Sequence, residues 1–236
     1  MRHNTFIKRF LALFITLLLF FAIHACKSAK NEAQLPVENY KPIRPVYVPN
    51  IPRLQNAIEE VKALAEKNDI DTLILIDGND NKLFLVSALP SIRILKEYKI
   101  SASKYGYGSE RGSNKTPWGV HVIDSKYGHN APSGMCFYDR KPTGEIATIY
   151  NDTTNVDKDP VTSRIIWLKG LEEINRTSYW RFVYIHGTHE EGLLGTPQSH
   201  GCIRLSNQDV IELFELVEAG TYVNIIRPLK DGSSEE

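Results

Sequence analysis

The chain has 236 residues, of which 42% are hydrophobic and 24% are charged. These proportions are typical of a globular protein with one large domain or two small ones, and they exclude wholesale disorder, collagen-like repeats and a polytopic membrane protein. The 28 basic and 28 acidic side chains give a net charge of zero, which argues against a nucleic-acid binder that depends on neutralising phosphates. Three cysteines are too few for a disulfide scaffold.

Residues 1–25 have the pattern of an export signal. Three basic residues, Arg2, Lys8 and Arg9, precede an apolar run of 14 residues, 10–23, that only one threonine interrupts. As a helix this run would be about 21 Å long, shorter than the roughly 30 Å hydrocarbon core of a bilayer. We therefore predict a signal peptide rather than a transmembrane helix. Without this segment the chain has a net charge of −3, so no basic surface is expected to attract it to anionic lipids or nucleic acid.

The apolar run ends at Ile23-His24-Ala25-Cys26, which resembles the bacterial lipobox. The resemblance implies that Cys26 is lipidated and becomes the new N-terminus, and that a membrane holds the protein on the periplasmic side of the cell envelope. Two alternatives stay open: cleavage after Ala25 without lipidation, and retention of the segment as an uncleaved anchor. In all three cases the body of the protein leaves the cytoplasm.

A proline-rich segment follows. Residues 26–53 contain five prolines and no periodic apolar pattern, which predicts an extended, semi-rigid tether. Residues 54–70 are then predicted to form an amphipathic helix that packs on the domain, because apolar residues recur at helical spacing. These residues are Leu54, Ala57, Ile58, Val61, Leu64 and Ala65.

From residue 71 the apolar period becomes that of β-strands. Two apolar runs, 72–76 and 83–86, flank a group of turn-forming residues, which predicts a hairpin. Two segments rich in Gly, Ser, Asn and Pro, 104–117 and 127–142, are predicted to be exposed loops. Further strands are expected at 92–100, 119–123, 146–150, 163–168, 181–185 and 222–226.

A second helix is predicted near the C-terminus. Ser206 and Asp209 form a pattern like a capping box, an apolar helix face follows, and Gly220 marks the end. The sequence therefore predicts a mainly β domain with flanking helices over residues 71–229, followed by a polar tail at 230–236.

The densest group of reactive side chains lies between residues 184 and 205. His186 ends an apolar strand, and Cys202 lies in a loop just before the second predicted helix. A thiol with an ordinary pKa of about 8.5 is mostly protonated at neutral pH and attacks well only as the thiolate, so His186 is the candidate base. Gly201 lets the backbone approach a substrate closely, and the amides of Gly201 and Cys202 are candidate oxyanion donors. Arg204 is a cation suited to a substrate carboxylate.

Two other interpretations of these residues stay open. One is purely structural: a buried thiol surrounded by hydrogen-bonded histidines. The other is a zinc site, whose four ligands would be His186, His189, His200 and Cys202. Cys136, which has no histidine nearer in sequence than His129, is predicted to be a core or edge thiol.

The order and spacing of these residues resemble one family. His-Gly-Thr at 186–188 and Ser-His-Gly-Cys-Ile-Arg-Leu at 199–205 resemble the active-site motif of the L,D-transpeptidase catalytic domain, the YkuD-like family. Lys-Thr-Pro-Trp-Gly-Val at 115–120 is similar to an upstream segment of the same family. The resemblance covers residues 71–227 and implies a mainly β, sandwich-like fold with flanking helices.

The resemblance also implies a reaction. Cys202 would attack a peptidoglycan stem tetrapeptide at the bond between the L-centre of a diamino acid and the terminal D-alanine. D-Alanine would leave, a thioester would form, and an amine of another stem peptide or of a protein would resolve it. By matching position, His186 is the general base, the Gly187 carbonyl orients its imidazole, and His200 and Gly201 shape the oxyanion side.

Four residues are candidates for substrate binding: Arg204, Ser199, Tyr184 and Trp118. Arg204 is expected to support either substrate binding or loop geometry, and Ser199 to bond locally rather than to react. No metal or cofactor is expected, and neither a Gly-x-Ser-x-Gly nor a Gly-x-Gly-x-x-Gly motif occurs in the sequence. The expected partners are peptidoglycan stem peptides and, through Cys26, a membrane. Nucleic acid is not expected, and the protein is predicted to be a monomer.

Alternatives to transpeptidation also stay open. With water in place of the acceptor amine, the same Cys202 and His186 would make an L,D-carboxypeptidase or a hydrolase that releases stem-linked proteins. A non-catalytic lipoprotein that binds cell wall would not need an activated thiol. Because no separate peptidoglycan-binding repeat is visible in the sequence, the tether and the lipid are expected to localise the domain.

Overall fold

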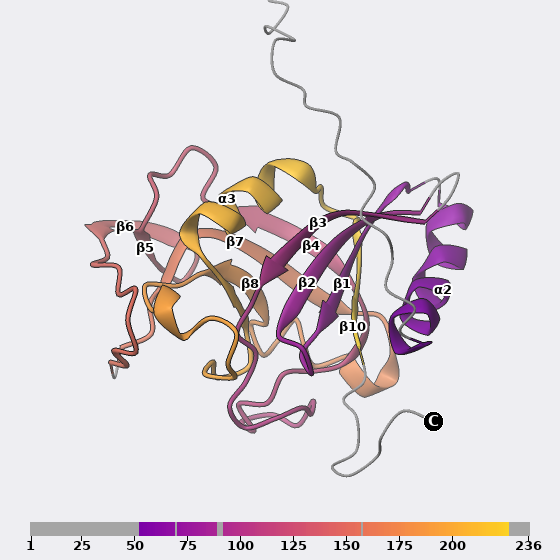
Figure 1. Ribbon diagram of the computed structural model, residues 1–236, viewed down its shortest axis with the longest axis horizontal. Helices are drawn as coiled ribbons and strands as arrows, with labels where there is room; N and C mark the ends of the chain where they lie inside the picture. Colours follow the sequence, from indigo (N-terminus) through magenta and orange to yellow (C-terminus); the bar gives the residue numbers. More distant parts are fainter. Residues whose placement is uncertain (1–51, 69, 89–91, 157, 227–236) are drawn as a thin grey trace, which may run out of the picture. The chain divides into compact units, whose positions relative to one another are not determined.

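The computed structural model describes residues 52–68, 70–88, 92–156 and 158–226. The predicted signal peptide, Cys26, nearly all of the predicted tether and the predicted tail lie outside the described residues. Figure 1 shows the helices and strands of the described part. Their bounds are α2 Pro52–Lys67, β1 Thr72–Asp77, β2 Lys82–Ser87, β3 Arg93–Lys99, β4 Gly119–Tyr127, β5 Met135–Tyr138, β6 Lys141–Ile146, β7 Val161–Gly170, η1 Glu173–Asn175, β8 Tyr184–Gly187, η2 Glu191–Leu193, β9 Ile203–Leu205, α3 Asn207–Leu216 and β10 Tyr222–Ile225.

The strands form one mixed sheet. Its order is β3-β2-β1-β10-β4-β7-β5-β6, and β8 pairs with β7 and β9. The pairs β1 with β10 and β8 with β9 are parallel, and the other pairs are antiparallel. Helix α2 contacts β1 and β10, whereas α3 contacts β7 and β8, so the two helices cover different parts of the sheet (Figure 1).

Alternate side chains of β1 pack into two separate cores. Ile74 and Ile76 lie in the core that α3 shares, whereas Leu73 and Leu75 lie in the core formed with α2. All four side chains are fully buried, and each such burial is worth roughly 1.5–3 kcal/mol relative to exposure. A strand that is buried on both faces has a continuous apolar sequence, which explains the unbroken apolar run at 73–76.

The predicted mainly β fold with flanking helices is confirmed. The expected hairpin forms between β1 and β2, and α2 covers most of the range predicted for the first helix. The second helix begins as predicted, because Ser206 Oγ accepts a hydrogen bond from Asp209 N at 3.0 Å. It ends at Leu216, before Gly220.

Two local predictions are wrong. Of the strand expected at 146–150, only Ile146 belongs to a strand, β6. The segment 127–142, expected to be a loop, contains β5 and the turn into β6. The turn residues Asp139 and Arg140 have φ values of 45° and 65°, which a two-residue hairpin turn needs but which glycine or asparagine usually supplies. Strand β6 is exposed along its whole length, so no alternation of apolar residues marks it in the sequence.

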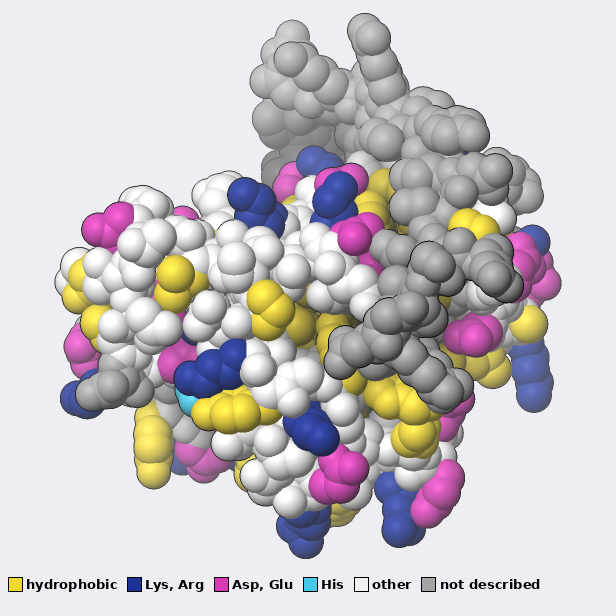
Figure 2. Space-filling view, turned by 60° about the horizontal axis from the view of Figure 1, so that its bottom comes forward, with side chains coloured by type: hydrophobic (Ala, Val, Ile, Leu, Met, Phe, Trp, Pro, Cys, Tyr) yellow, Lys and Arg dark blue, Asp and Glu magenta, His cyan; other side chains and the backbone are white. Residues whose placement is uncertain are grey.

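The described surface mixes all types of side chain. On the face drawn in Figure 2, Lys, Arg, Asp and Glu side chains are interspersed with apolar ones, in keeping with the balanced charge of the sequence. Among the described residues, no helix is both long and apolar enough to cross a membrane.

Candidate active site

Strands β8 and β9 bring the predicted nucleophile and base to neighbouring positions. The two strands run parallel, with His186 opposite Arg204. Cys202 directly precedes β9 and is therefore level with Tyr184 on β8. The Tyr184 N–H points to Cys202 Sγ, with an N···S distance of 3.5 Å.

The sulfur of Cys202 is a thiol in this structure. Its S–H group donates to the carbonyl oxygen of Phe182, 3.4 Å away. The pKa of Cys202 is raised to about 11, chiefly by burial and in part by the charge of Asp159, whereas the Tyr184 N–H and two nearby arginines oppose the rise. Because the thiolate is the nucleophile, Cys202 needs a base before it can attack.

The His186 ring is buried and oriented by its own strand. Its Nδ1 lies 2.8 Å from the carbonyl oxygen of Gly187. Because a carbonyl oxygen only accepts hydrogen bonds, Nδ1 carries the proton and Nε2 presents the basic lone pair. Burial lowers the pKa of His186, and the charge of Asp159 and the Gly187 hydrogen bond only partly offset that effect. The ring is therefore neutral at pH 7 and suited to accept a proton.

Gly187 has no room for a side chain. A Cβ atom there would lie 2.8 Å from Asn207 Oδ1 and 2.8 Å from the Thr162 carbonyl oxygen. The Thr162 backbone and the hydrogen-bonded Asn207 side chain cannot easily move aside. Glycine is therefore required at position 187, where the carbonyl orients His186.

The thiol and the imidazole are not hydrogen-bonded to each other within the described residues, because the S–H group is turned to Phe182 O. Phe182 itself has a φ of 56°, a left-handed conformation that is an outlier for a bulky residue. Backbone strain of this kind is concentrated at functional sites, and here it presents a carbonyl to the candidate nucleophile.

The loop before Cys202 is held by local hydrogen bonds. Ser199 is buried; its Oγ donates to Cys202 O at 2.6 Å and accepts from Gly201 N at 3.2 Å, which fits the expectation that Ser199 bonds locally. Gly201 has a φ of 119°, where a side chain is strained, and its carbonyl accepts from Thr116 Oγ1 at 3.2 Å. The Gly201 N–H already donates to Ser199 Oγ, whereas the Cys202 N–H has no acceptor among the described residues.

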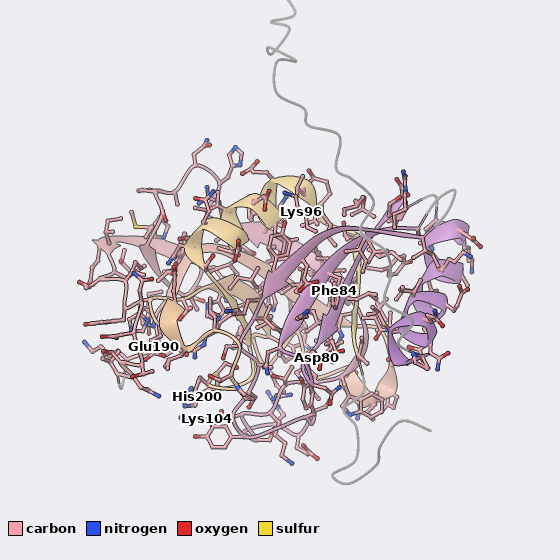
Figure 3. All side chains as sticks on the ribbon, viewed as in Figure 1. Asp80, Phe84, Lys96, Lys104, Glu190 and His200 are labelled. Atoms are coloured by element: carbon pink, nitrogen blue, oxygen red, sulfur yellow. The ribbon has the colours of Figure 1, made fainter. Side chains whose placement is uncertain are left out.

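His200 lies at the rim of the site. Its side chain is exposed, and its ring lies 5.6 Å from the Tyr105 ring at an angle of 51°. Figure 3 shows His200 close to Lys104, whose ammonium lies 5.4 Å from the centre of the same Tyr105 ring. His200 is thus exposed beside Tyr105, two residues before Cys202.

Arg204 is a buried structural cation rather than a surface one. Its side chain is 1% exposed, and its Nη1 donates to Glu190 at 2.8 Å and to Asp159 at 3.0 Å. Figure 3 labels Glu190 on the segment that follows β8. Two carboxylates already pair with the charge of the guanidinium, although its Nε has no partner among the described residues. The paired charge favours the expected role in loop geometry over contact with a substrate carboxylate.

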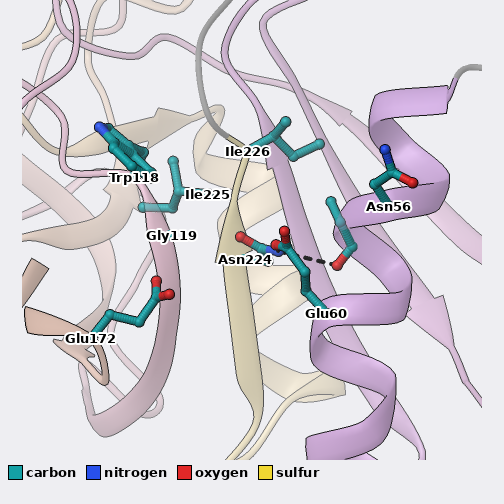
Figure 4. Close-up of a pocket in the computed structure, with 9 residues that line it drawn as sticks. Asn56, Glu60, Trp118, Gly119, Glu172, Asn224, Ile225 and Ile226 are labelled. Atoms are coloured by element: carbon teal, nitrogen blue, oxygen red, sulfur yellow. Dashed lines mark hydrogen bonds between the residues drawn. The ribbon is translucent and has the colours of Figure 1, made fainter. Parts of the chain in front are cut away.

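Tyr184 and Trp118 differ in position. Tyr184 packs edge-on against Trp167, with ring centres 5.7 Å apart, and its hydroxyl accepts from Arg140 at 3.2 Å. Trp118 lines a pocket of about 270 Å³ between α2, β4 and β10 (Figure 4). Cys202 does not line that pocket, so the expected contact of Trp118 with a substrate at Cys202 gains no support.

Two charged residues near Cys202, Arg181 and Asp159, are not among the residues predicted from the sequence; the charge of Asp159 raises the pKa of Cys202 and that of Arg181 lowers it. Arg181 falls in the strand predicted at 181–185, but β8 begins only at Tyr184. The first part of that prediction is wrong because the positive φ of the residue after Arg181 breaks the extended backbone. Asp159 follows a polar stretch with no motif, and its partner Arg204 is remote in sequence.

Cys136 is a buried free thiol on β5, as predicted. Burial raises its pKa. No set of three or more His, Cys, Asp and Glu side chains in the described residues is arranged to hold a metal ion. The zinc interpretation of the four predicted ligands therefore has no geometric support.

Comparison with known proteins gives consistent matches. Probable L,D-transpeptidase YbiS of Escherichia coli K12 is 47% identical over 51 residues, 21% of this chain and 17% of that protein. Putative L,D-transpeptidase YkuD of Bacillus subtilis is 51% identical over 43 residues, 18% of this chain and 26% of that protein. The matched segments thus span about a quarter or less of these relatives. A solved L,D-transpeptidase from Mycobacterium smegmatis aligns with a TM-score of 0.42 and 17% identity, over 66% of this chain and 59% of that one.

The family profile covers much more of the chain than these pairwise matches. The YkuD profile, which describes the L,D-transpeptidase catalytic domain, matches residues 71–225. This range contains every strand from β1 to β10 and the whole site around Cys202. The chain belongs to the L,D-transpeptidase catalytic domain family.

Proposed function

We propose that this protein is a peptidoglycan L,D-transpeptidase with Cys202 as its nucleophile. The observation that carries the proposal is the placement of Cys202 directly before β9 and of His186 on the paired strand β8, with His186 Nδ1 committed to the Gly187 carbonyl. This arrangement leaves Nε2 free to take the thiol proton. Membership of the family supports the same chemistry.

The acylation step follows from these positions. The thiol turns from Phe182 O to His186, the S–H bond breaks, and the proton passes to Nε2. The thiolate attacks the carbonyl carbon between the L-centre of the diamino acid and the terminal D-alanine. His186 then gives its proton to the amine of D-alanine as the C–N bond breaks, which leaves a thioester on Cys202.

The second half of the reaction restores the thiol. An amine of another stem peptide, or of a protein, attacks the thioester and gives one proton to His186. The C–S bond breaks, the new amide bond forms, and His186 returns the proton to Cys202. No step requires a metal or a cofactor, so we expect activity to be unchanged by a chelator; loss of activity would revive the zinc interpretation.

The Cys202 N–H is the backbone donor available to the oxyanion of both tetrahedral intermediates. The Gly201 N–H is already donated to Ser199 Oγ. Removing one such donor reduces kcat by about 10²–10³-fold in other acyl-transfer enzymes. The role of Gly201 is therefore conformational, because its positive φ aims the next amide.

Mass spectrometry of the products tests the proposal. The purified chain is incubated with disaccharide-tetrapeptide. Two variants are incubated in parallel: Cys202→Ala, which removes the thiol, and Ser199→Ala, which removes a hydroxyl that bonds only within its loop. Cross-linked dimers that disappear in Cys202→Ala support the transpeptidase. Tripeptide without dimers means that water is the acceptor and that the protein is an L,D-carboxypeptidase or a hydrolase. If neither product nor an acyl adduct on Cys202 forms, tetrapeptide is not the donor, and a non-catalytic protein that binds cell wall becomes the leading hypothesis.

Anchoring in the envelope is part of the proposal. The apolar run and the Ile-His-Ala-Cys sequence at 23–26 support export and lipidation of Cys26 on the periplasmic side of a membrane. Metabolic labelling with an alkyne fatty acid tests this: label on the wild type and none on Cys26→Ser is expected. Label that persists in the variant, or no label in either, contradicts it. We further propose that the protein is a monomer, which light scattering checks.

A further inference from the structure

Arg181 connects the turn before β8 to a loop that is remote in sequence. Its Nη1 donates to the Gly108 carbonyl at 3.1 Å, and its Nη2 donates to the Lys115 carbonyl at 2.5 Å and to Ser113 Oγ at 3.4 Å. All three acceptors are uncharged. None of the ion pairs among the described residues includes Arg181.

Two neighbours of this guanidinium lie beside the nucleophile: the Lys115 carbonyl is next to Gly201, and the Phe182 carbonyl is next to the Cys202 thiol. The Lys115 carbonyl oxygen lies 3.2 Å from the position that a Cβ on Gly201 would take, so the loop that Arg181 holds packs against the residue before Cys202. On the other side, Phe182 follows Arg181 in the chain, and its carbonyl accepts the thiol hydrogen of Cys202.

The other charges around Cys202 do not favour a thiolate. Arg204 is paired with two carboxylates, so these three groups together have a net charge of −1. The imidazole and the nearby phenol are neutral at pH 7. Arg181 is thus the cation near Cys202 without a paired carboxylate in the described part of the chain. The charged groups that act on Cys202 are Arg181, Arg204 and Asp159. Of the other titratable groups near them, Tyr184 is the neighbouring phenol, Glu190 pairs with Arg204, His186 lies on the paired strand, and the charge of Glu110 acts on Arg181.

We propose that Arg181 is a positioning residue of the reaction: its charge stabilises the Cys202 thiolate, and its hydrogen bonds hold residues 108–115 against Gly201. The inference rests on the proposed role of Cys202 as nucleophile. When the S–H bond breaks and the proton moves to His186, negative charge appears on the sulfur and meets an unpaired guanidinium. Burial lowers the pKa of Arg181, and the charges of Cys202 and Glu110 raise it; for Cys202 and Arg181 this is expected of two groups that stabilise each other's charged forms.

Alkylation of the full-length chain measures the thiolate without any substrate. The rate of iodoacetamide addition to Cys202 is followed by peptide mass spectrometry between pH 6 and 10, which separates Cys202 from the other two cysteines. In Arg181→Gln we expect the pH profile to move upward by about one unit, equal to a roughly tenfold slower reaction at pH 7. Arg181→Lys, which keeps the charge, should retain most of the wild-type rate.

Arg176→Gln is the matched control, because Arg176 lies close by in sequence, is 70% exposed and pairs with Glu173 at 3.0 Å. Its pH profile should equal that of the wild type. An unchanged profile in a folded Arg181→Gln variant overturns the proposal. If that variant does not fold, Arg181→Met, which keeps an unbranched stem without the charge, takes its place with the same expected displacement. An Arg181→Met profile equal to that of the wild type, or an Arg181→Lys profile displaced by a full unit, contradicts the proposal.

The outcome is separable from the proposed function. If the wild type forms neither cross-links nor tripeptide but the alkylation profile is displaced in Arg181→Gln, the Arg181 inference stands and the transpeptidase proposal fails. If the wild type forms cross-links, and Arg181→Gln has the same alkylation profile and the same kcat as the wild type, the transpeptidase proposal stands and the Arg181 inference fails.

Discussion

The part of the domain beside α2 and the part that carries Cys202 share one apolar core but differ in how many polar side chains they bury. In the first, which we call the apolar half (β1, β2, β3, β10 and α2), the buried side chains are mostly Leu, Ile, Val and Ala. In the second, the polar half (β7, β8, β9 and residues 188–207), many buried side chains carry hydroxyl, amide, imidazole or charged groups. These are Thr162, Ser163, Arg164, His186, Thr188, His189, Glu190, Ser199, Arg204 and Asn207.

Asn207 shows what the polar half gains from such groups. Its Oδ1 accepts from Thr162 Oγ1 at 2.7 Å, and its Nδ2 donates to Thr188 O at 2.8 Å and to Glu191 Oε1 at 2.7 Å. One side chain thus ties β7, the segment after β8 and the start of α3. Apolar burial is non-directional, whereas hydrogen bonds fix distances and angles. A site that must align a thiol with an imidazole needs the second kind of contact.

The strongest test of this contrast is His186→Gln in the polar half. Glutamine keeps a polar group on β8 but has no lone pair basic enough to take the thiol proton. We expect kcat/KM for cross-link formation to fall by about 10²–10⁴-fold, with little change in melting temperature. Activity above a tenth of the wild type would mean that another group is the base.

Breaking the buried ion pair between Arg204 and Glu190 tests whether a loss of stability in the polar half also lowers activity. Glu190→Gln leaves Arg204 paired with Asp159, so no buried charge is left uncompensated, and loss of the charged hydrogen bond should destabilise the protein by about 1.5–3 kcal/mol. Urea unfolding should show this loss, and kcat should fall because Arg204 lies opposite His186.

The matched control for Glu190→Gln lies in the apolar half. Leu75→Ala removes a fully buried side chain next to α2 and should cost about 2–5 kcal/mol. Measured well below its melting temperature, this variant should keep wild-type kcat. An equal fall of kcat in both variants would show that the two halves are not functionally distinct.

Acid should weaken the protein through one histidine. His121 on β4 is buried, with Nδ1 2.9 Å from Gly119 O and Nε2 2.9 Å from Ser178 Oγ, and burial lowers its pKa to about 4. The unfolded chain takes up this proton near pH 6.5, so the stability is fully present above pH 6.5 and is lost as the pH falls toward 4. The loss amounts to about 3 kcal/mol.

Urea unfolding at pH 7.5 and 4.5 measures the effect of His121. His121→Gln should have a lower stability at pH 7.5 and a smaller difference between the two pH values than the wild type. The same pH dependence in variant and wild type would assign the acid sensitivity to other groups, such as His186, whose pKa burial also lowers.

The apolar half is predictable from sequence because its signal is local. Residues 73–76 and the first helix display their burial as runs or periods of apolar side chains, and both elements form where expected. In the polar half, the motif around His186 and Cys202 identifies the pair, but not its surroundings. The partners of Arg181 lie 66–73 residues away, and β6 has no buried face. Periodicity cannot reveal either feature.

The smallest expected effect concerns helix α3, which packs on the polar half. Ser206 Oγ caps α3 by accepting from Asp209 N at 3.0 Å, and α3 contacts β7 and β8. Ser206→Ala should destabilise the protein by about 1 kcal/mol, which lowers the melting temperature by roughly 2–4 °C in a domain of this size. Ser206→Asn, which keeps a capping oxygen, should restore most of that loss. Because the cap makes no contact with Cys202 among the described hydrogen bonds, kcat at 25 °C should stay at the wild-type value in both variants. A fall in kcat would instead place the start of α3 within the network that aligns the site.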